Sequence, residues 1–253
     1  MFDKRKLVMA VVFFMLFIII AFFAVFMIGQ KNRVVKNSIN TLNQAQGDDA
    51  RELLKLNQAA LASGNGETQT PVMVATDHFQ GDLNAPVKII VFEDITDQYS
   101  AVFNEVLKTV EQNYGDKVAV AFRPFMLTPS ALSKDSFAAL ECAGEQTKFN
   151  EFRNLILEKV KGGELDSEGL GGYAESLGLD RAKFDSCLNQ GGFQEKVAKV
   201  AGEAQKYSVY GTPTIFVNGQ IVPGARSFED VTGSAGEKIE GLKAIIDRQL
   251  NNN

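Results

Sequence analysis

The chain has 253 residues, of which 45% are apolar, enough to build one sizeable core with at most one smaller appendage. Its formal net charge of −5 is unevenly spread, because residues 1–36 carry +5 and the remainder therefore carries −10. An acidic main region without a basic stripe argues against nucleic acid as a partner.

An apolar segment lies close to the N-terminus. Residues 7–28 contain no charged or strongly polar side chain, and at about 1.5 Å per residue they are long enough to cross a hydrocarbon core of about 30 Å. A cleaved signal peptide usually has a shorter apolar region that ends in a small-residue cleavage site, and no such site follows Ile28. The sequence therefore predicts an uncleaved transmembrane anchor over residues 7–28.

The charges beside this segment give a weak orientation signal. Three basic residues precede the segment and three follow it, so only the free α-amino group favours a cytoplasmic N-terminus, which would place residues 1–6 inside. We expect a single-pass protein of the cell membrane whose C-terminal part lies outside the cytoplasm. Residues 29–71 are predicted to form a helical stalk and linker, because their apolar stripe is too thin to support a core. The folded domain is then expected over residues 72–253.

The folded domain opens with a strand, a helix and a second strand. Residues 87–92 are apolar and rich in β-branched side chains, which is typical of a buried central strand. Apolar residues from Tyr99 to Tyr114 recur at helical spacing, and Val118, Val120 and Phe122 then alternate as a second strand. This order predicts a βαβ unit with a right-handed crossover.

Residues from about 130 to 208 are predicted to be helical throughout, with breaks at the glycine pairs 162–163, 171–172 and 191–192. Strand signals return at residues 214–217 and 220–222, which Asn218 and Gly219 join as a hairpin turn. A last helix is expected to carry Ile239, Leu242, Ile245, Ile246 and Leu250 on one side. The predicted order is βαβ, helical insertion, ββα.

This order resembles the DsbA-like family of thiol-disulfide oxidoreductases. The segments that carry the likeness are Gly81–Val87 with its continuation to Asp94, Phe137–Phe152, and Val209–Gly219. The resemblance covers residues 78 to about 250 and implies an α/β, thioredoxin-like fold split by a helical insertion. It also implies that Pro213 follows a cis peptide bond and lies beside the active site.

The cysteine pair that gives this family its activity is absent. The family's Cys-x-x-Cys falls on Asp97, Gln98, Tyr99 and Ser100. At the N-terminus of the following helix, orphan N–H groups and the dipole stabilise a thiolate in active relatives, whereas Asp97 is already an anion and a favoured N-cap residue. Ser100 forms no mixed disulfide, so the family's redox cycle is closed unless another thiol substitutes.

Two cysteines lie elsewhere in the chain, Cys142 and Cys187, 45 positions apart in the predicted insertion. We expect a structural disulfide between them, which by the loop-entropy model contributes roughly 3 to 4 kcal/mol. Two buried free thiols are a second reading, because free cysteine is often fully buried. A catalytic pair is the least favoured of the three.

Metal and cofactor signals are weak. His78 is the only histidine, which excludes a cluster of histidine ligands, and we expect it at the surface. Glu93, Asp94 and Asp97 form an acidic cluster that would suit a hard cation. The resemblance favours a structural reading, because an acidic residue commonly matches Asp94 and Asp97 serves as the cap. We expect no metal and no cofactor.

Two classes of function remain. The first is a non-redox DsbA-like domain that binds extended polypeptide, or another exported or membrane protein, through Gln98, Tyr99, Thr212 and Pro213, in a chaperone or adaptor role. The alternative is a thiol-disulfide oxidoreductase or isomerase that uses Cys142 and Cys187, or a non-thiol reaction at Asp97 and Ser100. The first is favoured, because fold alone does not imply function.

Overall fold

The computed structural model describes residues 70–126, 129–234 and 236–252, which belong to one structural unit, Asp48–Asn253. Within these ranges, no helix combines the length and apolar character that crossing a bilayer requires. The predicted anchor at residues 7–28 and almost all of the predicted stalk lie outside the described residues.

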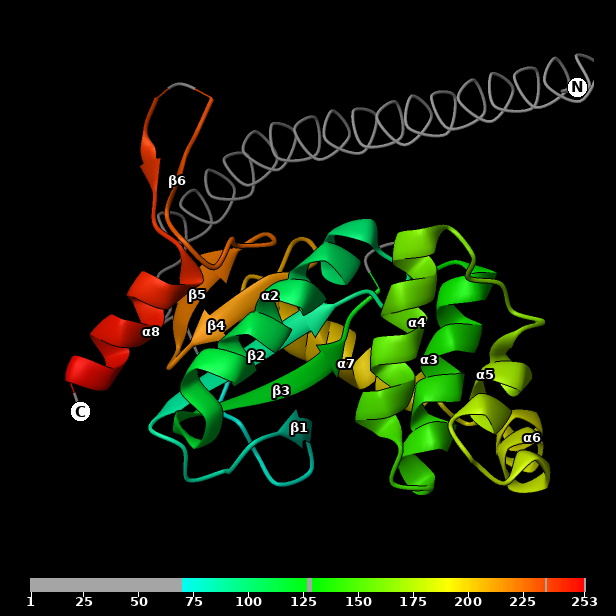
Figure 1. Cartoon of the computed structure of the whole chain (residues 1–253). Coiled ribbons are helices and arrows are strands. Elements are labelled where there is room, and N and C mark those ends of the chain that lie inside the picture. Colours follow the sequence, from blue (N-terminus) through cyan, green and yellow to red (C-terminus); the bar gives the residue numbers. More distant parts are fainter. Residues whose placement is uncertain (1–69, 127–128, 235, 253) are drawn as a thin grey trace, which may run out of the picture. The chain divides into compact units, whose positions relative to one another are not determined.

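A five-stranded mixed sheet forms the centre of the unit (Figure 1). Its strands lie in the order β1-β3-β2-β4-β5, where β2 and β3 are parallel and the other neighbours are antiparallel. Their bounds are β1 His78–Gln80, β2 Val87–Glu93, β3 Val118–Pro124, β4 Thr214–Val217 and β5 Gln220–Pro223. The short β1 forms one edge, and the predicted pairing of the two central strands is confirmed.

The side chains of β2 and β3 alternate between two buried faces. Ile89 and Val91 face the core beneath α2 (Gln98–Tyr114) and α8 (Leu242–Asn251). Ile90 and Phe92 face a second cluster, which α7 (Gln194–Lys206) covers from the other side (Figure 1). Because both faces are buried, these strands read as nearly continuous apolar runs in the sequence.

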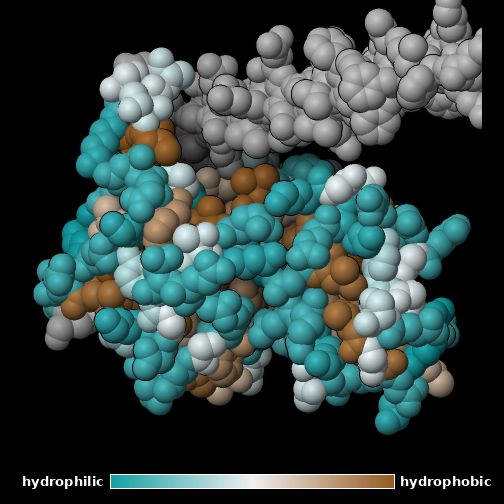
Figure 2. All heavy atoms as spheres, viewed as in Figure 1, coloured by the Kyte–Doolittle hydropathy of each residue, from teal (hydrophilic) through white to brown (hydrophobic). Residues whose placement is uncertain are grey.

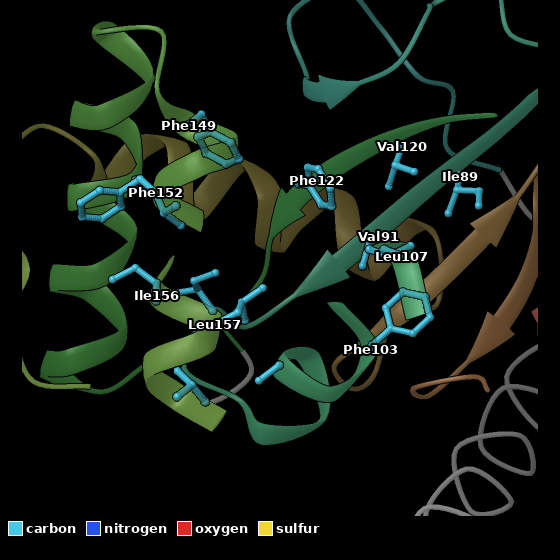
Figure 3. Close-up of a cluster of buried hydrophobic side chains, with 14 of the residues drawn as sticks. Ile89, Val91, Phe103, Leu107, Val120, Phe122, Phe149, Phe152, Ile156 and Leu157 are labelled. Carbon is cyan, nitrogen blue, oxygen red and sulfur yellow. The ribbon is translucent and has the colours of Figure 1, made fainter. Parts of the chain in front are cut away.

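Four helices form the insertion between β3 and α7 (Figure 1). Their bounds are α3 Ala131–Glu145, α4 Phe149–Gly162, α5 Leu170–Ser176 and α6 Arg181–Gln190. Figure 3 shows Phe149, Phe152, Ile156 and Leu157 of α4 in one cluster with Phe122 of β3 and with side chains of β2 and α2. The insertion therefore shares its core with the sheet.

The predicted hairpin between β4 and β5 is confirmed. Asn218 and Gly219 have φ values of 46° and 84°, the left-handed backbone that a tight two-residue turn needs. Asn218 also accepts a hydrogen bond from Lys88 N at 2.8 Å through its side-chain oxygen. The turn is thereby attached to the start of β2.

Two details of the predicted elements are wrong. The glycine pair 171–172 lies inside α5 and does not separate helices. The guanidinium group of Arg181 lies against this part of the helix, and a Cβ atom on Gly171 would come within 2.4 Å of its central carbon. Ile239 lies in β7 (Lys238–Ile239), which pairs with β6 (Val231–Thr232). The last helix begins only after Gly241, whose backbone is extended.

Candidate functional site

Asp97 caps the N-terminus of α2, as predicted. Its backbone is extended, and its side chain accepts hydrogen bonds from Tyr99 N at 3.1 Å and Ser100 N at 3.0 Å. These N–H groups have no partner within the helix, so an acidic side chain at this position satisfies them. The carboxylate occupies the helix end where the family's first cysteine would stand.

The same carboxylate connects the helix to the loop before β4. Asp97 Oδ2 also accepts from Ser100 Oγ at 3.0 Å and from Thr212 Oγ1 at 3.3 Å. Ser100 is fully buried, and Asp97 is partly buried. Burial raises the pKa of the Asp97 carboxyl above its ordinary value, although the four hydrogen bonds oppose that shift.

The loop before β4 places Thr212 and Pro213 next to this helix end. The peptide bond between them is cis, Pro213 is buried, and Thr214 pairs with Phe92 at the end of β2. Tyr210 in the same loop is 41% exposed. The chain thus brings the Thr212 loop and the turn around Asp97 together from sequence positions more than a hundred residues apart.

Gln98 and Tyr99, the other two residues predicted to face a peptide, differ in their exposure. Gln98 is exposed, yet its Nε2 donates to Val160 O at the end of α4 at 2.6 Å. Tyr99 is partly buried. Gln98 therefore links the start of α2 to the insertion, and the insertion borders the site.

Cys142 on α3 and Cys187 on α6 form the predicted disulfide. Their Cα atoms are 5.8 Å apart, and both residues are buried, with exposed fractions of 0% and 8%. Both ends of the bond belong to the insertion. No cysteine is present at the N-terminus of α2, so the turn around Asp97 has no thiol.

A buried ion pair lies beneath the site, and sequence reasoning missed it. Arg153 of α4 donates to Glu93 at 2.5 and 2.6 Å, and both side chains are at most 3% exposed. Arg153 also donates to Asn104 Oδ1 at 2.8 Å, and its guanidinium carbon lies 3.7 Å from the centre of the Phe122 ring. The available signal was a charged residue within the apolar face of the α4 sequence.

His78 lies at the surface with 25% of its side chain exposed, but it also has partners that the sequence did not indicate. Its ring stacks on Phe149 with centroids 3.7 Å apart, and its Nε2 lies 3.2 Å from the buried Glu141. Lys196 of α7 contacts the same carboxylate oxygen. Burial would raise the pKa of Glu141, but the hydrogen bonds from His78 and Lys196 outweigh it and hold the pKa below its ordinary value.

Among the described residues, no group of three or more histidine, cysteine, aspartate or glutamate side chains is placed to hold a metal ion. Asp94 accepts from Thr96 N at 2.9 Å and from Thr96 Oγ1 at 2.7 Å, which stabilises the turn before Asp97. The acidic residues at this turn thus have structural partners.

The sheet order and the helix that follows the central strand define a thioredoxin-fold protein, and helices α3–α6 between its halves give the DsbA-like form. A family model described as thioredoxin matches residues 73–234, more than half of the chain. The chain belongs to this thioredoxin family, and the predicted fold with its helical insertion is confirmed.

Solved structures support the same fold. The oxidised form of BdbD from Bacillus subtilis superposes with a TM-score of 0.59 at 21% identity and covers 74% of this chain and 100% of that chain. Alpha-DsbA1 from Wolbachia pipientis gives a TM-score of 0.56 at 18% identity, over 72% of this chain and 94% of that chain. At these identities the likeness concerns the fold alone.

Similar sequences also occur within longer proteins. A protein of Salinispora arenicola named Na(+)/H(+) antiporter NhaA 1 is 28% identical over 195 residues, which are 77% of this chain. This chain spans 29% of the length of that relative. The shared region is therefore one part of the antiporter-named protein.

Proposed function

We propose that this protein is a non-redox binding module that takes up extended polypeptide beside the Thr212–Pro213 loop. The observation that carries the proposal is the carboxylate of Asp97, which fills the reactive position of the fold and already accepts four hydrogen bonds. A carboxylate exchanges no disulfides, so the site keeps the shape of a thiol exchanger without its nucleophile.

The loop offers groups that suit an extended chain. Within the described residues, the main-chain N–H and C=O of Thr212 form no hydrogen bond with other backbone groups. Tyr210 adds an exposed aromatic ring two residues away. Main-chain pairing with a side-chain contact beside it is a recurring way of recognising extended peptides.

The protein is proposed to act at the cell membrane, with residues 7–28 as a single-pass anchor and the folded domain outside the cytoplasm. Its partner is then an extended polypeptide or another exported or membrane protein. The relative named as an antiporter supports this setting, because an antiporter exchanges ions across a membrane. A role as adaptor or chaperone fits a binding domain without redox chemistry.

The redox alternative has less support. Cys142 and Cys187 are bonded to each other and buried, whereas a reactive cysteine must be reached by its substrate. Ser100 is fully buried and donates to Asp97, which leaves its hydroxyl poorly placed for a non-thiol reaction.

Restoring the cysteine pair tests the redox part of the proposal. We expect the native domain to be inactive in insulin reduction and in the oxidative refolding of a reduced protein, and the Asp97→Cys/Ser100→Cys variant to gain activity. The Asp97→Ala/Ser100→Ala variant is the matched control, because it changes the same positions without adding a thiol. Turnover by the native domain would refute the proposal.

Binding is tested separately with a reduced, carboxymethylated polypeptide and fluorescence anisotropy. Tyr210→Asp is expected to weaken binding about tenfold, the loss typical of an aromatic anchor. Val231→Asp is the matched control, because Val231 is 43% exposed, close to the 41% of Tyr210, but lies on the β6–β7 hairpin. Equal affinities of the two variants would show that the Tyr210 loop is not the binding surface.

A further inference from the structure

A cavity lies between α2, β3 and the segment that follows β1, and the proposed function does not use it. Its volume is about 240 Å³, and Val118, Val120 and Phe122 of β3 form its apolar floor together with Leu107 of α2. All four side chains belong to the core on the α2 side of the sheet. Figure 2 shows apolar atoms between hydrophilic residues near the centre of this face. The cavity therefore connects the hydrophilic surface with apolar side chains of the core.

The floor determines what kind of body a matching ligand has. Its side chains are buried but keep a small exposed fraction, which is 8% at Val120 and 6% at Leu107. An apolar group that enters this space leaves water and gains apolar contacts, which is favourable. A dry cavity of roughly 150 Å³ takes up benzene. The cavity of about 240 Å³ therefore suits a single six-membered ring or a short branched chain.

Three exposed carboxylates also line the cavity, and they form its mouth. They belong to Asp82, Glu111 and Asp116. None of them forms an ion pair within the described part of the chain. Asp82 accepts from Asn84 N at 2.8 Å, a contact within its own turn that brings no positive charge. The mouth is thus negatively charged.

The basic residue in the lining, Lys108, does not offset these charges. Its ammonium group contacts the carboxylates of Glu105 and Glu158, each at 3.2 Å. The C-terminus of α2 also lies at the cavity, because Glu111 belongs to its last turn and Gly115 is its cap. That last turn has no basic residue, and the C-terminal end of a helix dipole attracts a positive charge. Both features favour a cation over an anion at the mouth.

The positions of the two parts distinguish a free amine from a side chain of a partner. The carboxylates are exposed and the floor is buried, so a matching ligand enters with its apolar end first. A lysine side chain of a partner polypeptide would enter with its ammonium first and bring the charge to the apolar floor, which is costly. A free molecule is not restricted in this way.

We propose that this cavity binds a small organic amine, whose primary ammonium is carried on one ring or a short branched chain. The apolar body packs on the floor, and the ammonium lies at the mouth beside Glu111 and Asp116. An ammonium has three N–H donors, so it donates to more than one carboxylate while its body stays on the floor.

The experiment titrates the full-length protein with cyclohexylamine, which is protonated at neutral pH, and follows the methyl signals of Val118 and Val120 by ¹H–¹³C NMR. Cyclohexanol and cyclohexanecarboxylate are the matched probes, because they carry a neutral and a negative group on the same ring. We expect cyclohexylammonium to bind about tenfold more tightly than the carboxylate, as two or three exposed charge pairs would give, with cyclohexanol between them. Equal affinities, the reverse order, or no shift with cyclohexylammonium while the protein stays folded would overturn the proposal.

Two further probes test the other possible occupants. Methylammonium has the charge without the apolar body and should leave the methyl signals of Val118 and Val120 unchanged. The amide of Nα-acetyl-lysine represents a side chain of a polypeptide and should bind more weakly than cyclohexylammonium. Binding of methylammonium as tight as that of cyclohexylammonium would refute the role of the floor, and tighter binding of the lysine derivative would assign the cavity to a polypeptide partner instead.

A variant of the mouth separates the charge from the cavity. Glu111→Gln/Asp116→Asn removes two carboxylates with little change in shape and should weaken cyclohexylammonium binding about three- to tenfold. Its affinity for cyclohexanol should stay unchanged, which shows that the cavity is intact. Glu168→Gln/Glu195→Gln is the matched control, because it removes two exposed carboxylates that do not line the cavity. Equal cyclohexylammonium affinities of the two variants would overturn the assigned role of the mouth.

Discussion

Asp97 experiences two opposing electrostatic effects. The N-terminus of α2 favours an anion through its dipole and through N–H groups that have no partner within the helix, while partial burial disfavours the charged carboxylate. The raised pKa shows that burial outweighs the rest. At this position a negative charge is tolerated for its cap geometry and costs some stability.

Replacing Asp97 by asparagine should therefore preserve the cap and remove the charge. A carboxyl whose folded pKa is raised stabilises the fold below its unfolded pKa of about 3.9 and loses that contribution as the pH rises through the folded pKa. We expect Asp97→Asn to be at least as stable as the native protein at pH 7, with the difference closing in acid. Urea unfolding at a series of pH values measures this. A variant that is less stable at neutral pH would contradict it.

The ion pair of Glu93 and Arg153 gives a second prediction. Arg153→Met leaves a buried carboxylate without its partner and should lower the free energy of unfolding by about 3 to 5 kcal/mol, as measured for broken buried pairs. The double variant Glu93→Gln/Arg153→Met removes both charges and should recover part of that loss. Equal losses in both variants would mean that packing, and not charge, sets the cost.

Lys196 of α7 forms an ion pair with Glu141 of α3, a helix of the insertion. Lys196→Met should raise the pKa of Glu141, because the ammonium group beside its carboxylate is removed, and should lower hydrogen-exchange protection in α7. Lys199→Met is the matched control, an exposed lysine three residues further along the same helix. Equal exchange in both variants would refute a special role for Lys196.

Elements with strong periodicity were predictable from the sequence, and short ones were not. The continuous apolar runs of β2 and β3 and the helical spacing of α2 identified those elements, and Asn218-Gly219 identified the hairpin. The three-residue β1 and the two-residue β6 and β7 lack the length to show a period. In addition, β1 pairs with β3, at least 40 residues further along the chain, whereas β6 and β7 pair with each other.

In the candidate site, too, contacts between residues close together in the sequence were predictable, and contacts between distant residues were not. The cap role of Asp97 was predictable, because the groups that donate to its carboxylate are the N–H groups of Tyr99 and Ser100, two and three residues further along the chain. The hydrogen bond from Thr212 to Asp97 and the ion pair of Glu93 with Arg153 join positions 115 and 60 residues apart. Such contacts arise from the packing of the sheet and the insertion, which no local pattern encodes.

For the whole molecule, the disulfide between Cys142 and Cys187 closes a 45-residue loop within the insertion. By the loop-entropy model its removal should lower the free energy of unfolding by about 3 to 4 kcal/mol. The Cys142→Ser/Cys187→Ser variant, compared with the native protein by urea unfolding, measures this value. A thiol titration of the native protein under denaturing, non-reducing conditions should find no free thiol, and two would refute the bond.

The same bond makes the protein dependent on others for its own maturation. When Cys142 and Cys187 join, two electrons and two protons leave the chain, and an outside acceptor must receive them. Asp97 and Ser100 carry no sulfur that could relay those electrons. This member of the thioredoxin family thus needs an external oxidant for its own disulfide, and its yield should follow the oxidising power of the compartment in which it folds.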